Sequence, residues 1–421
     1  MGARSRLRRI ALDLTPLRLS RDFRLLWTGM FVSQLGHQFA RVAIYVQVFA
    51  LTGSYVAVGL TGLIALTALV LGTVIASSFI DATDRRTVLM VSQVAYGASA
   101  GVLLVTALAS HPPLLAIYAA NAATAFISAI ESPSRQAMTV RLVGRELVPS
   151  ALALNQVMWQ TTQVAGPAVG GIVINALGLS WAYGIDLVTY GALFIAAMRM
   201  KPMPPEHDID TGWPAVREGF GYVRRHRLLQ STFVIDLVAM IFGMPAALFP
   251  GLALTQFHRG PEVVGYLLAA PSVGALMQAL AGGWVQRVRR QGVAIAWAVA
   301  GWGAAIAAFG LVGSNLPFAL VFLAIAGAAD VISAIFRSTI TQVSVPDRLR
   351  GRLQAIFTLV VTGGPRLGDF EAGLVARAFT PTISVVSGGV ACIAGAVAVA
   401  RLYPQLWSYR TDAQPDVPSG A

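Results

Sequence analysis

The stretch that decides the fold runs from Glu131 to Gly171 and reads ESPSRQAMTVRLVGRELVPSALALNQVMWQTTQVAGPAVGG. An apolar helix is expected to end within its first five residues, and a short basic, amphipathic segment follows. A second apolar helix is predicted to begin near Pro149, because proline is favoured at the first position of a helix. Its apolar pattern is interrupted late by pairs of Gly and Pro residues, which we interpret as a break.

The same order of helix, basic loop, helix and Gly/Pro break returns from Phe336 to Gly373. When Arg135 is aligned with Arg337, the two copies lie 202 residues apart (337 − 135) in parallel orientation. Few residues are identical, but the pattern is the same. A unit of this length that is repeated half a chain apart predicts a protein built from two like halves.

The composition favours the bilayer as solvent. Of the 421 residues, 56% are hydrophobic and 12% are charged, so a water-soluble domain would expose far too much apolar surface. The net charge of +12 suggests nucleic-acid binding until the charges are located. They lie in short loops between apolar runs, which excludes a nucleic-acid partner. The single cysteine, Cys392, excludes an intramolecular disulfide and a cysteine-based metal cluster.

Apolar runs of about 20 residues predict twelve membrane spans. They are expected near residues 23–51, 55–80, 87–109, 113–133, 150–177, 181–200, 228–254, 262–286, 292–312, 315–336, 352–377 and 381–403. The domain organisation follows: an N-terminal six-helix bundle (1–200), a linker with an amphipathic helix (201–227), a C-terminal six-helix bundle (228–405) and a tail (406–421).

Arginine residues mark one set of span ends. The N-terminal segment, the linker and every second loop are rich in arginine, whereas the alternate loops offer only Arg259 and Arg377. By the positive-inside rule, the arginine-rich ends are cytoplasmic. We therefore expect a multi-pass protein of the cytoplasmic membrane with both termini in the cytoplasm.

The loop after the second predicted span reads SSFIDATDRRTVLM (residues 77–90). It resembles the motif G-x-L-A-D-R-x-G-R-R of the major facilitator superfamily, with Asp81, Arg85 and Arg86 at matching positions. Asp84 replaces the Gly before the arginine pair, as in the enterobactin-exporter-like branch of siderophore and drug efflux proteins. The resemblance implies an all-α fold of two pseudo-symmetric six-helix bundles, and a latch at this loop. Charges that only set the topology are the alternative interpretation.

The fifth predicted span carries a second motif of the superfamily. Gly166, Pro167, Gly170 and Gly171 match the antiporter signature G-x-x-x-G-P-x-x-G-G, in which Thr162 replaces the first Gly. Glycine permits close helix contact and proline removes a hydrogen bond, so this segment is a candidate pivot. Ordinary packing of small residues is the alternative. Glu131 and Arg135, spaced to pair on one helix, are candidate gating residues or a brace for the helix end.

Polar side chains inside spans are costly and tend to face an aqueous cavity. They form stripes of helical period on spans one, four, seven and ten, the spans that line the cavity in the family that the sequence resembles. The stripe on span ten consists of Asp330, Ser333 and Arg337. The candidate cavity residues are Gln34, His37, Gln38, Arg41, Tyr45, Asn121, Thr124, Ser128, Asp236, Asp330 and Ser333.

Three of these are candidates for proton coupling: Asp236, Asp330 and His37. Neither aspartate has a basic neighbour one turn deeper on its own helix, and a desolvated carboxyl binds protons readily. His37 has an intrinsic proton affinity near neutral pH. The alternative is a structural hydrogen bond to a neighbouring helix. The fourth span lacks the arginine usual in the family, and we hypothesise that Arg41 supplies that charge.

These features predict a secondary active transporter that exports an amphipathic small molecule by proton antiport with alternating access. Uptake or lipid flipping on the same fold is one alternative, and a polytopic enzyme or sensor is another. The last is disfavoured because no phosphate loop, metal motif or nucleophile motif is present. We expect no cofactor and no metal, with the proton gradient as driving force, membrane lipids as partners and a monomeric state. The sequence does not name the substrate.

Overall fold

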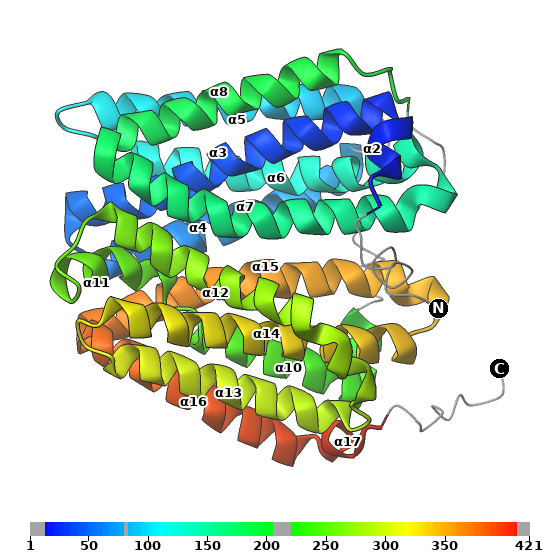
Figure 1. Ribbon diagram of the computed structural model, residues 1–421, viewed down its shortest axis with the longest axis vertical. Helices are drawn as coiled ribbons and strands as arrows, with labels where there is room; N and C mark the ends of the chain where they lie inside the picture. The colour runs from blue at the N-terminus through cyan, green and yellow to red at the C-terminus, as the bar shows by residue number, and fades with distance from the viewer. Residues whose placement is uncertain (1–12, 80–82, 205–219, 411–421) are drawn as a thin grey trace, which may run out of the picture. The chain divides into compact units, whose positions relative to one another are not determined.

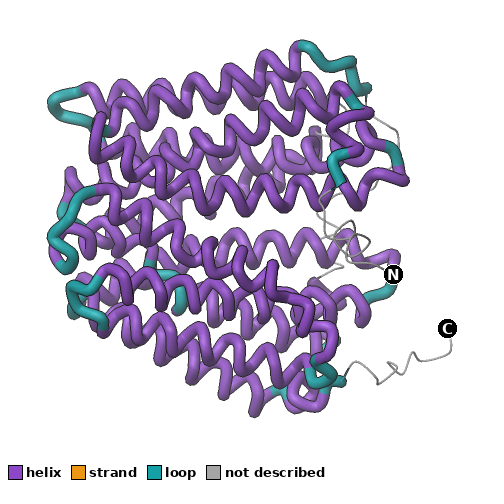
Figure 2. The backbone as a smooth tube through the Cα atoms, in the orientation of Figure 1, coloured by secondary structure: helices purple, strands orange, loops and turns teal. Residues whose placement is uncertain are grey.

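The computed structural model describes residues 13–79, 83–204 and 220–410, which form helices and short loops without a β-strand (Figures 1 and 2). By their contacts the residues divide into two compact units. Unit 1 comprises residues 1–44 and 67–209, and unit 2 comprises residues 45–66 and 210–421. The two predicted six-helix bundles were defined by the sequence repeat and the span count, whereas these units are defined by contacts. The predicted domain boundaries therefore stay a prediction.

Unit 1 is built from the first six long helices. They are most of α3 (Arg21–Thr52), the later part of α4 (Tyr55–Phe79), α5 (Arg85–Leu108), α6 (Leu114–Val143), α7 (Val148–Leu177) and α8 (Leu179–Met198), with short α2 (Thr15–Leu19) and the 3-10 turn η2 (Arg145–Leu147). A core of buried Leu and Met side chains joins α3, α5, α6, α7 and α8 around Met30, Leu89 and Met158.

Unit 2 contains the remaining helices together with the end of α3 and the start of α4. They are α10 (Arg227–Phe242), η3 (Ala246–Leu248), α11 (Phe249–Thr255), α12 (Pro261–Ala281), η4 (Gly282–Arg287), α13 (Gln291–Leu311), α14 (Leu316–Ser344), α15 (Asp347–Ala378), α16 (Pro381–Leu402) and α17 (Pro404–Ser408).

The helices have the length and surface of membrane spans. Nine in the described residues are long and apolar enough to cross a bilayer, with α10 to α11 taken as one. The other long helices, α3, α7 and α15, have 32, 30 and 32 residues and more polar side chains. With these three, the long helices of the described residues are consistent with the twelve predicted spans of an all-α membrane protein. Valine and leucine side chains on α5, such as Val91 and Val105, are more than 60% exposed, which suits a lipid-facing surface.

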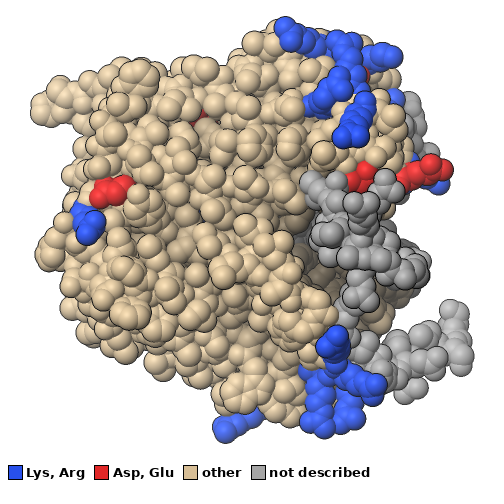
Figure 3. Space-filling model, viewed as in Figure 1, with Lys and Arg blue, Asp and Glu red and all other residues tan. Residues whose placement is uncertain are grey.

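The charged side chains lie where membrane spans require them. In Figure 3 the flanks of the helices are almost free of charge, and the Lys and Arg side chains gather at helix ends. This distribution is the one that the sequence predicts for a multi-pass membrane protein, because lysine and arginine are costly within the hydrocarbon region.

Two of the predicted helix breaks are wrong. Helix α6 does not end at Glu131–Arg135 but continues past Pro133 to Val143. Helix α7 is continuous across Gly166 and Pro167, from Val148 to Leu177. A proline inside a packed membrane helix is tolerated, because neighbouring helices and small local adjustments satisfy the freed carbonyl group.

The seventh span, in contrast, is interrupted. Helix α10 ends at Phe242, and the chain resumes as η3 and α11. The indole Nε1 of Trp302 donates to the carbonyl of Gly243 at 3.1 Å, which satisfies a group that the break leaves free. Irregular backbone at this depth is possible only where protein groups take over the lost hydrogen bonds.

Glycine residues allow close contact between the fifth and first spans, and equivalent glycines allow it between the eleventh and seventh spans. A Cβ at Gly166 would lie 2.5 Å from the Gln38 Cβ, so α7 and α3 touch almost backbone to backbone. In unit 2, a Cβ at Gly368 would lie 2.6 Å from the carbonyl oxygen of Met240. Both residues are shifted by 202 positions (368 − 166 and 240 − 38), which confirms the internal repeat at the level of packing.

Candidate functional site

A group of buried charges in unit 2 is the strongest candidate site. The Arg337 guanidinium on α14 donates a hydrogen bond from Nη1 to Oδ1 of Asp236 on α10. Its Nη2 lies 3.7 Å from Oδ1 of Asp330, two turns earlier on α14. The side chains of Arg337 and Asp236 are 3% and 1% exposed, whereas that of Asp330 is 34% exposed.

This geometry corrects one expectation. Neither aspartate has a basic neighbour one turn deeper on its own helix, but Arg337, two turns from Asp330, faces both carboxyls. The repeat alignment and the polar stripe on the tenth span both contain Arg337, yet no role followed from either. The available signal was the spacing of seven residues between Asp330 and Arg337, which places both on one helical face. Because removal of one partner would leave a buried uncompensated charge, the pair is energetically coupled.

Several polar atoms of this group retain unused hydrogen-bonding capacity. Asp236 Oδ2, Asp330 Oδ1, Ser333 Oγ and Arg337 Nε are buried and have no hydrogen-bond partner within the described part of the chain. Buried polar atoms are usually satisfied, so four such atoms in one place set this group apart from the rest of the described interior. Ser333, a predicted cavity residue, is thus found beside the charged group, one turn from Asp330 on the same helix.

The first-span stripe divides between the two units. His37 Nδ1 lies 3.1 Å from the hydroxyl oxygen of Tyr190 on α8. Gln38 is buried against Gly166, and Gln34 and Arg41 are half-buried. Tyr45 belongs to unit 2, where its hydroxyl donates to Oδ2 of Asp369 at 2.6 Å. A common cavity lined by these residues stays a prediction.

The fourth-span residues make local contacts. The hydroxyls of Thr124 and Ser128 donate to carbonyls of their own helix, at 3.0 and 2.8 Å, and Asn121 is half-buried beside them on α6. The predicted pair of Glu131 and Arg135 is present, with 2.9 Å between Oε1 and Nε. The contact confirms that Glu131 and Arg135 pair along one helix, as their spacing predicted. A role in gating stays a prediction.

The loop before α5 braces two helix ends within unit 1. Asp81 lies outside the described residues. Asp84 caps α5 by accepting from Thr87 N at 3.1 Å, and its other oxygen accepts from Met203 N at 2.7 Å. Arg86 donates to the carbonyls of Ala197 and Met198 at 2.9 and 2.7 Å, which neutralises the end of α8. Arg85 joins the same brace through its backbone. A latch role for the loop stays a prediction, as does a pivot at Gly166, Pro167, Gly170 and Gly171.

Asp369 on α15 forms a junction that the sequence did not predict. Besides Tyr45, its carboxylate accepts from the backbone N–H of Ala247 at 2.9 Å, just after the break in the seventh span. Close by, Arg366 donates to the carbonyl of Ala65 on α4 at 2.7 Å. The start of α4 therefore rests on α15 within unit 2, at residues more than 300 positions apart in sequence.

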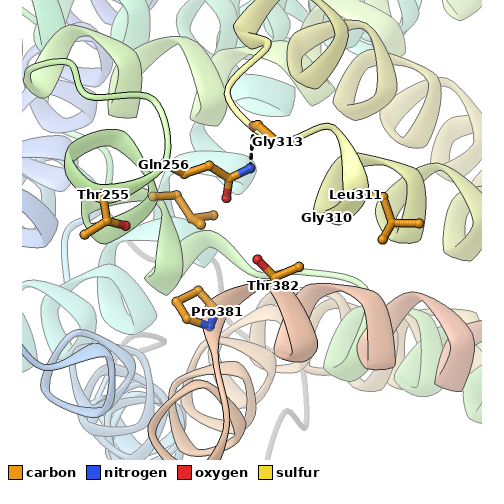
Figure 4. A pocket seen from close by; sticks show the side chains of 8 residues that line it. Thr255, Gln256, Gly310, Leu311, Gly313, Pro381 and Thr382 are labelled. Carbon is orange, nitrogen blue, oxygen red and sulfur yellow. Dashed lines mark hydrogen bonds between the residues drawn. The ribbon is translucent and has the colours of Figure 1, made fainter.

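A pocket of about 410 Å³ lies at helix ends in unit 2 (Figure 4). It is lined by Leu252, Thr255, Gln256, Gly310, Leu311, Gly313, Pro381 and Thr382. Two of the lining residues are hydrogen bonded to each other, because Gln256 donates to the carbonyl of Gly313 at 2.6 Å. None of the predicted site residues lines it, so it is not the charged group described above. Among the described residues, no cluster of three or more His, Cys, Asp or Glu is placed to hold a metal ion.

Comparison with known proteins places this fold. The family model MFS_3, described as transmembrane secretion effector, matches residues 11–416. The enterobactin exporter EntS of Citrobacter koseri is 26% identical over 421 residues, covering 97% of this chain and 98% of the relative. Its counterpart in Shigella boydii is 26% identical over 383 residues, covering 90% of this chain and 91% of the relative.

Solved transporter structures share the fold at low identity. The nucleoside transporter NupG superposes with a TM-score of 0.74 at 13% identity, over 92% of this chain and 100% of that structure. A bacterial homologue of the iron transporter ferroportin, in an inward-facing state, gives 0.69 at 14% identity, over 92% and 99%. The chain is a multi-pass membrane transporter and not an enzyme, and it belongs to the transmembrane secretion effector family of the major facilitator superfamily.

Proposed function

We propose that this transporter exports an amphipathic, siderophore- or drug-like molecule across the cytoplasmic membrane in exchange for protons. The observation that carries the proposal is the group formed by Asp236, Arg337 and Asp330. Two relatives that cover 97% and 90% of the chain are enterobactin exporters, which supports a siderophore as substrate and export as direction. The arginine-rich ends support a cytoplasmic location of both termini.

The buried guanidinium can respond to one proton. With both carboxyls charged, Arg337 carries one positive charge against two negative charges, and Asp236 accepts its hydrogen bond. Asp330 is the carboxyl we assign to proton uptake, because its side chain is 34% exposed whereas that of Asp236 is 1% exposed. A hydronium ion gives its proton to the Asp330 carboxylate and leaves as water, after which the group is electrically neutral.

Protonation of Asp330 removes the one excess negative charge of the group. A neutral group costs less free energy when the surrounding helices close and exclude water. Release of the same proton to the cytoplasmic side restores the negative charge and resets the group. Coupling follows if the helices rearrange between the two protonation states, as rocking of two bundles in alternating access requires. The residues need no cofactor for this cycle, and the proton gradient supplies the energy. We further propose that the transporter works as a monomer surrounded by lipid.

The proposal is tested in proteoliposomes that contain purified protein and an imposed pH gradient, with enterobactin as probe. Wild-type protein should accumulate enterobactin only while the gradient lasts, and an uncoupler should abolish the accumulation. Asp236→Asn and Asp330→Asn should lose the dependence on the gradient, while Asp13→Asn, at an exposed carboxyl, should retain it. Full dependence in both buried variants would show that the proton is carried elsewhere. Accumulation that persists with the uncoupler would exclude antiport.

A further inference from the structure

A second buried titratable group lies in unit 1 and takes no part in the proposed cycle. Asp186 and Tyr190 lie one turn apart on α8, which places their side chains on the same face of the helix. The Tyr190 hydroxyl also meets His37 Nδ1 of α3, at 3.1 Å. We propose that Asp186, Tyr190 and His37 form a proton-binding site in addition to the group around Arg337. The site goes beyond the proposed antiport, because proton binding can be measured without transport.

The carboxyl is deeply buried and only partly satisfied. Asp186 is 2% exposed, and its Oδ1 has no hydrogen-bond partner among the described residues. A charged carboxylate at such a place loses several kcal/mol of hydration unless partners replace the water. A neutral carboxyl avoids that cost, so this position favours a group whose charge can be removed by a proton.

The surroundings supply few compensating charges. From α8, Tyr183 and Tyr190 face Asp186, and from α5 Tyr96 stacks on Tyr190 with ring centroids 5.1 Å apart. The charged groups of α6 near these rings are Glu131 and Arg135, which pair with each other at 2.9 Å. From α3, the titratable group is His37. The rings of Tyr96 and Tyr190 are buried and keep water from the carboxyl.

The geometry provides a route for the proton. His37 is half-buried, whereas Tyr190 and Asp186 are buried. In the proposed site, the charged Asp186 carboxylate accepts from the Tyr190 hydroxyl, and His37 Nδ1–H donates to the Tyr190 oxygen, which lies 3.1 Å away. A proton that arrives at Nε2 drives a relay: Nδ1–H passes to Tyr190, and the Tyr190 proton passes to Asp186. The products are a neutral carboxylic acid, an intact phenol and a neutral imidazole protonated at Nε2, so one proton is gained.

The site is coupled to helix packing. A Cβ at Gly36 would lie 3.0 Å from the Asp186 Cα, so α3 and α8 touch at the level of the carboxyl. Charging or neutralising Asp186 therefore changes the energy of this contact directly. Because α3 also carries Gln38 and Arg41, a proton at Asp186 can bias the position of the first-span stripe.

The direct test is an infrared titration of purified protein in lipid nanodiscs, from about pH 4 to about pH 9, the range in which buried carboxyls titrate. Wild-type protein should show carbonyl bands of buried protonated carboxyls. Asp186→Asn should remove one of these bands, and Asp236→Asn should leave that band in place. Asp13→Asn should leave every buried band unchanged, because Asp13 is exposed.

A second variant tests the proposal independently of whether Asp186→Asn folds. Tyr190→Phe removes the donor that stabilises the carboxylate, so the Asp186 band should persist to higher pH than in wild type. Correct folding of each variant is checked by size-exclusion elution and far-ultraviolet circular dichroism. Identical spectra for wild-type and Asp186→Asn protein, or an unchanged titration in Tyr190→Phe, would overturn the proposal. The antiport proposal would survive that result, because its own test uses Asp236 and Asp330.

Discussion

Replacing Arg337 with Gln should destabilise unit 2 more than any other single change in the charged group. The substitution leaves Asp236 almost fully buried, and the described residues offer its carboxylate no other hydrogen-bond donor. Breaking a buried ion pair in this way costs about 3–5 kcal/mol. That cost corresponds to roughly a hundred-fold to a few-thousand-fold in the folding equilibrium, at about 1.4 kcal/mol for each factor of ten.

Replacing the partner carboxyl should destabilise the protein less. In Asp236→Asn, Arg337 keeps Asp330 at 3.7 Å as a second carboxylate, so a cost of about 1–3 kcal/mol is expected. The double variant should be more stable than the sum of the two single effects predicts, by about 1–3 kcal/mol, because no uncompensated carboxylate remains at Asp236. The deficit of Arg337→Gln should also shrink at acidic pH, since protonation removes the uncompensated charge.

The assay is unfolding of the purified protein in lipid bicelles, followed by tryptophan fluorescence, for wild type, both single variants and the double variant. Glu146→Gln serves as a control for removal of an exposed carboxyl. Additive effects of the two substitutions, or a cost for Arg337→Gln below that of Asp236→Asn, would refute the pairing as we describe it.

Three further predictions follow from individual contacts. Tyr45→Phe should cost about 1.5–3 kcal/mol in the same unfolding assay, because it removes a hydrogen bond to the Asp369 carboxylate; an unchanged stability would argue against the junction. Gly166→Leu should abolish transport in proteoliposomes by forcing α7 away from Gln38. The control variant Gly101→Leu should transport normally, because a Cβ at Gly101 meets no atom within 4 Å. Wild-type transport by Gly166→Leu would show that the fifth-span motif serves only ordinary helix packing. Hydrogen bonds from Thr15 and Ser150 hold the pKa of the Asp13 carboxyl below its usual value. This carboxyl therefore stabilises the fold at pH values above its unfolded pKa, and the stabilisation is lost as the pH falls through its folded pKa. Ser150→Ala should raise the Asp13 pKa measured by NMR, and an unchanged pKa would contradict the Ser150 contact.

The sequence was sufficient for the architecture because the bilayer imposes simple rules on it. Apolar runs of bilayer length, arginine at alternate span ends and a repeat at a separation of 202 residues predict two related halves, and the packing of Gly166 and Gly368 confirms the repeat. Helix ends were harder to predict. Proline is only a probable terminator, and α6 passes through Pro133 because packing in the membrane outweighs its local cost.

The partners of the polar side chains were beyond the sequence for a physical reason. Helical period tells which residues share a face, but not how that face is rotated toward a neighbouring helix. The stripes on spans seven and ten therefore contained Asp236 and Arg337 without indicating that they meet. The contact of Tyr45 with Asp369 joins residues 324 positions apart, and nothing in either local pattern specifies it.

Proton antiport requires proton movement that depends on substrate, and this movement can be measured. Proteoliposomes loaded with a pH-sensitive dye receive an outward or inward gradient of enterobactin without any imposed pH gradient. Wild-type protein should move protons against the direction of the substrate, and Asp330→Asn should move none. Enterobactin flux with no accompanying proton signal, or an undiminished signal in Asp330→Asn, would contradict proton antiport through Asp330.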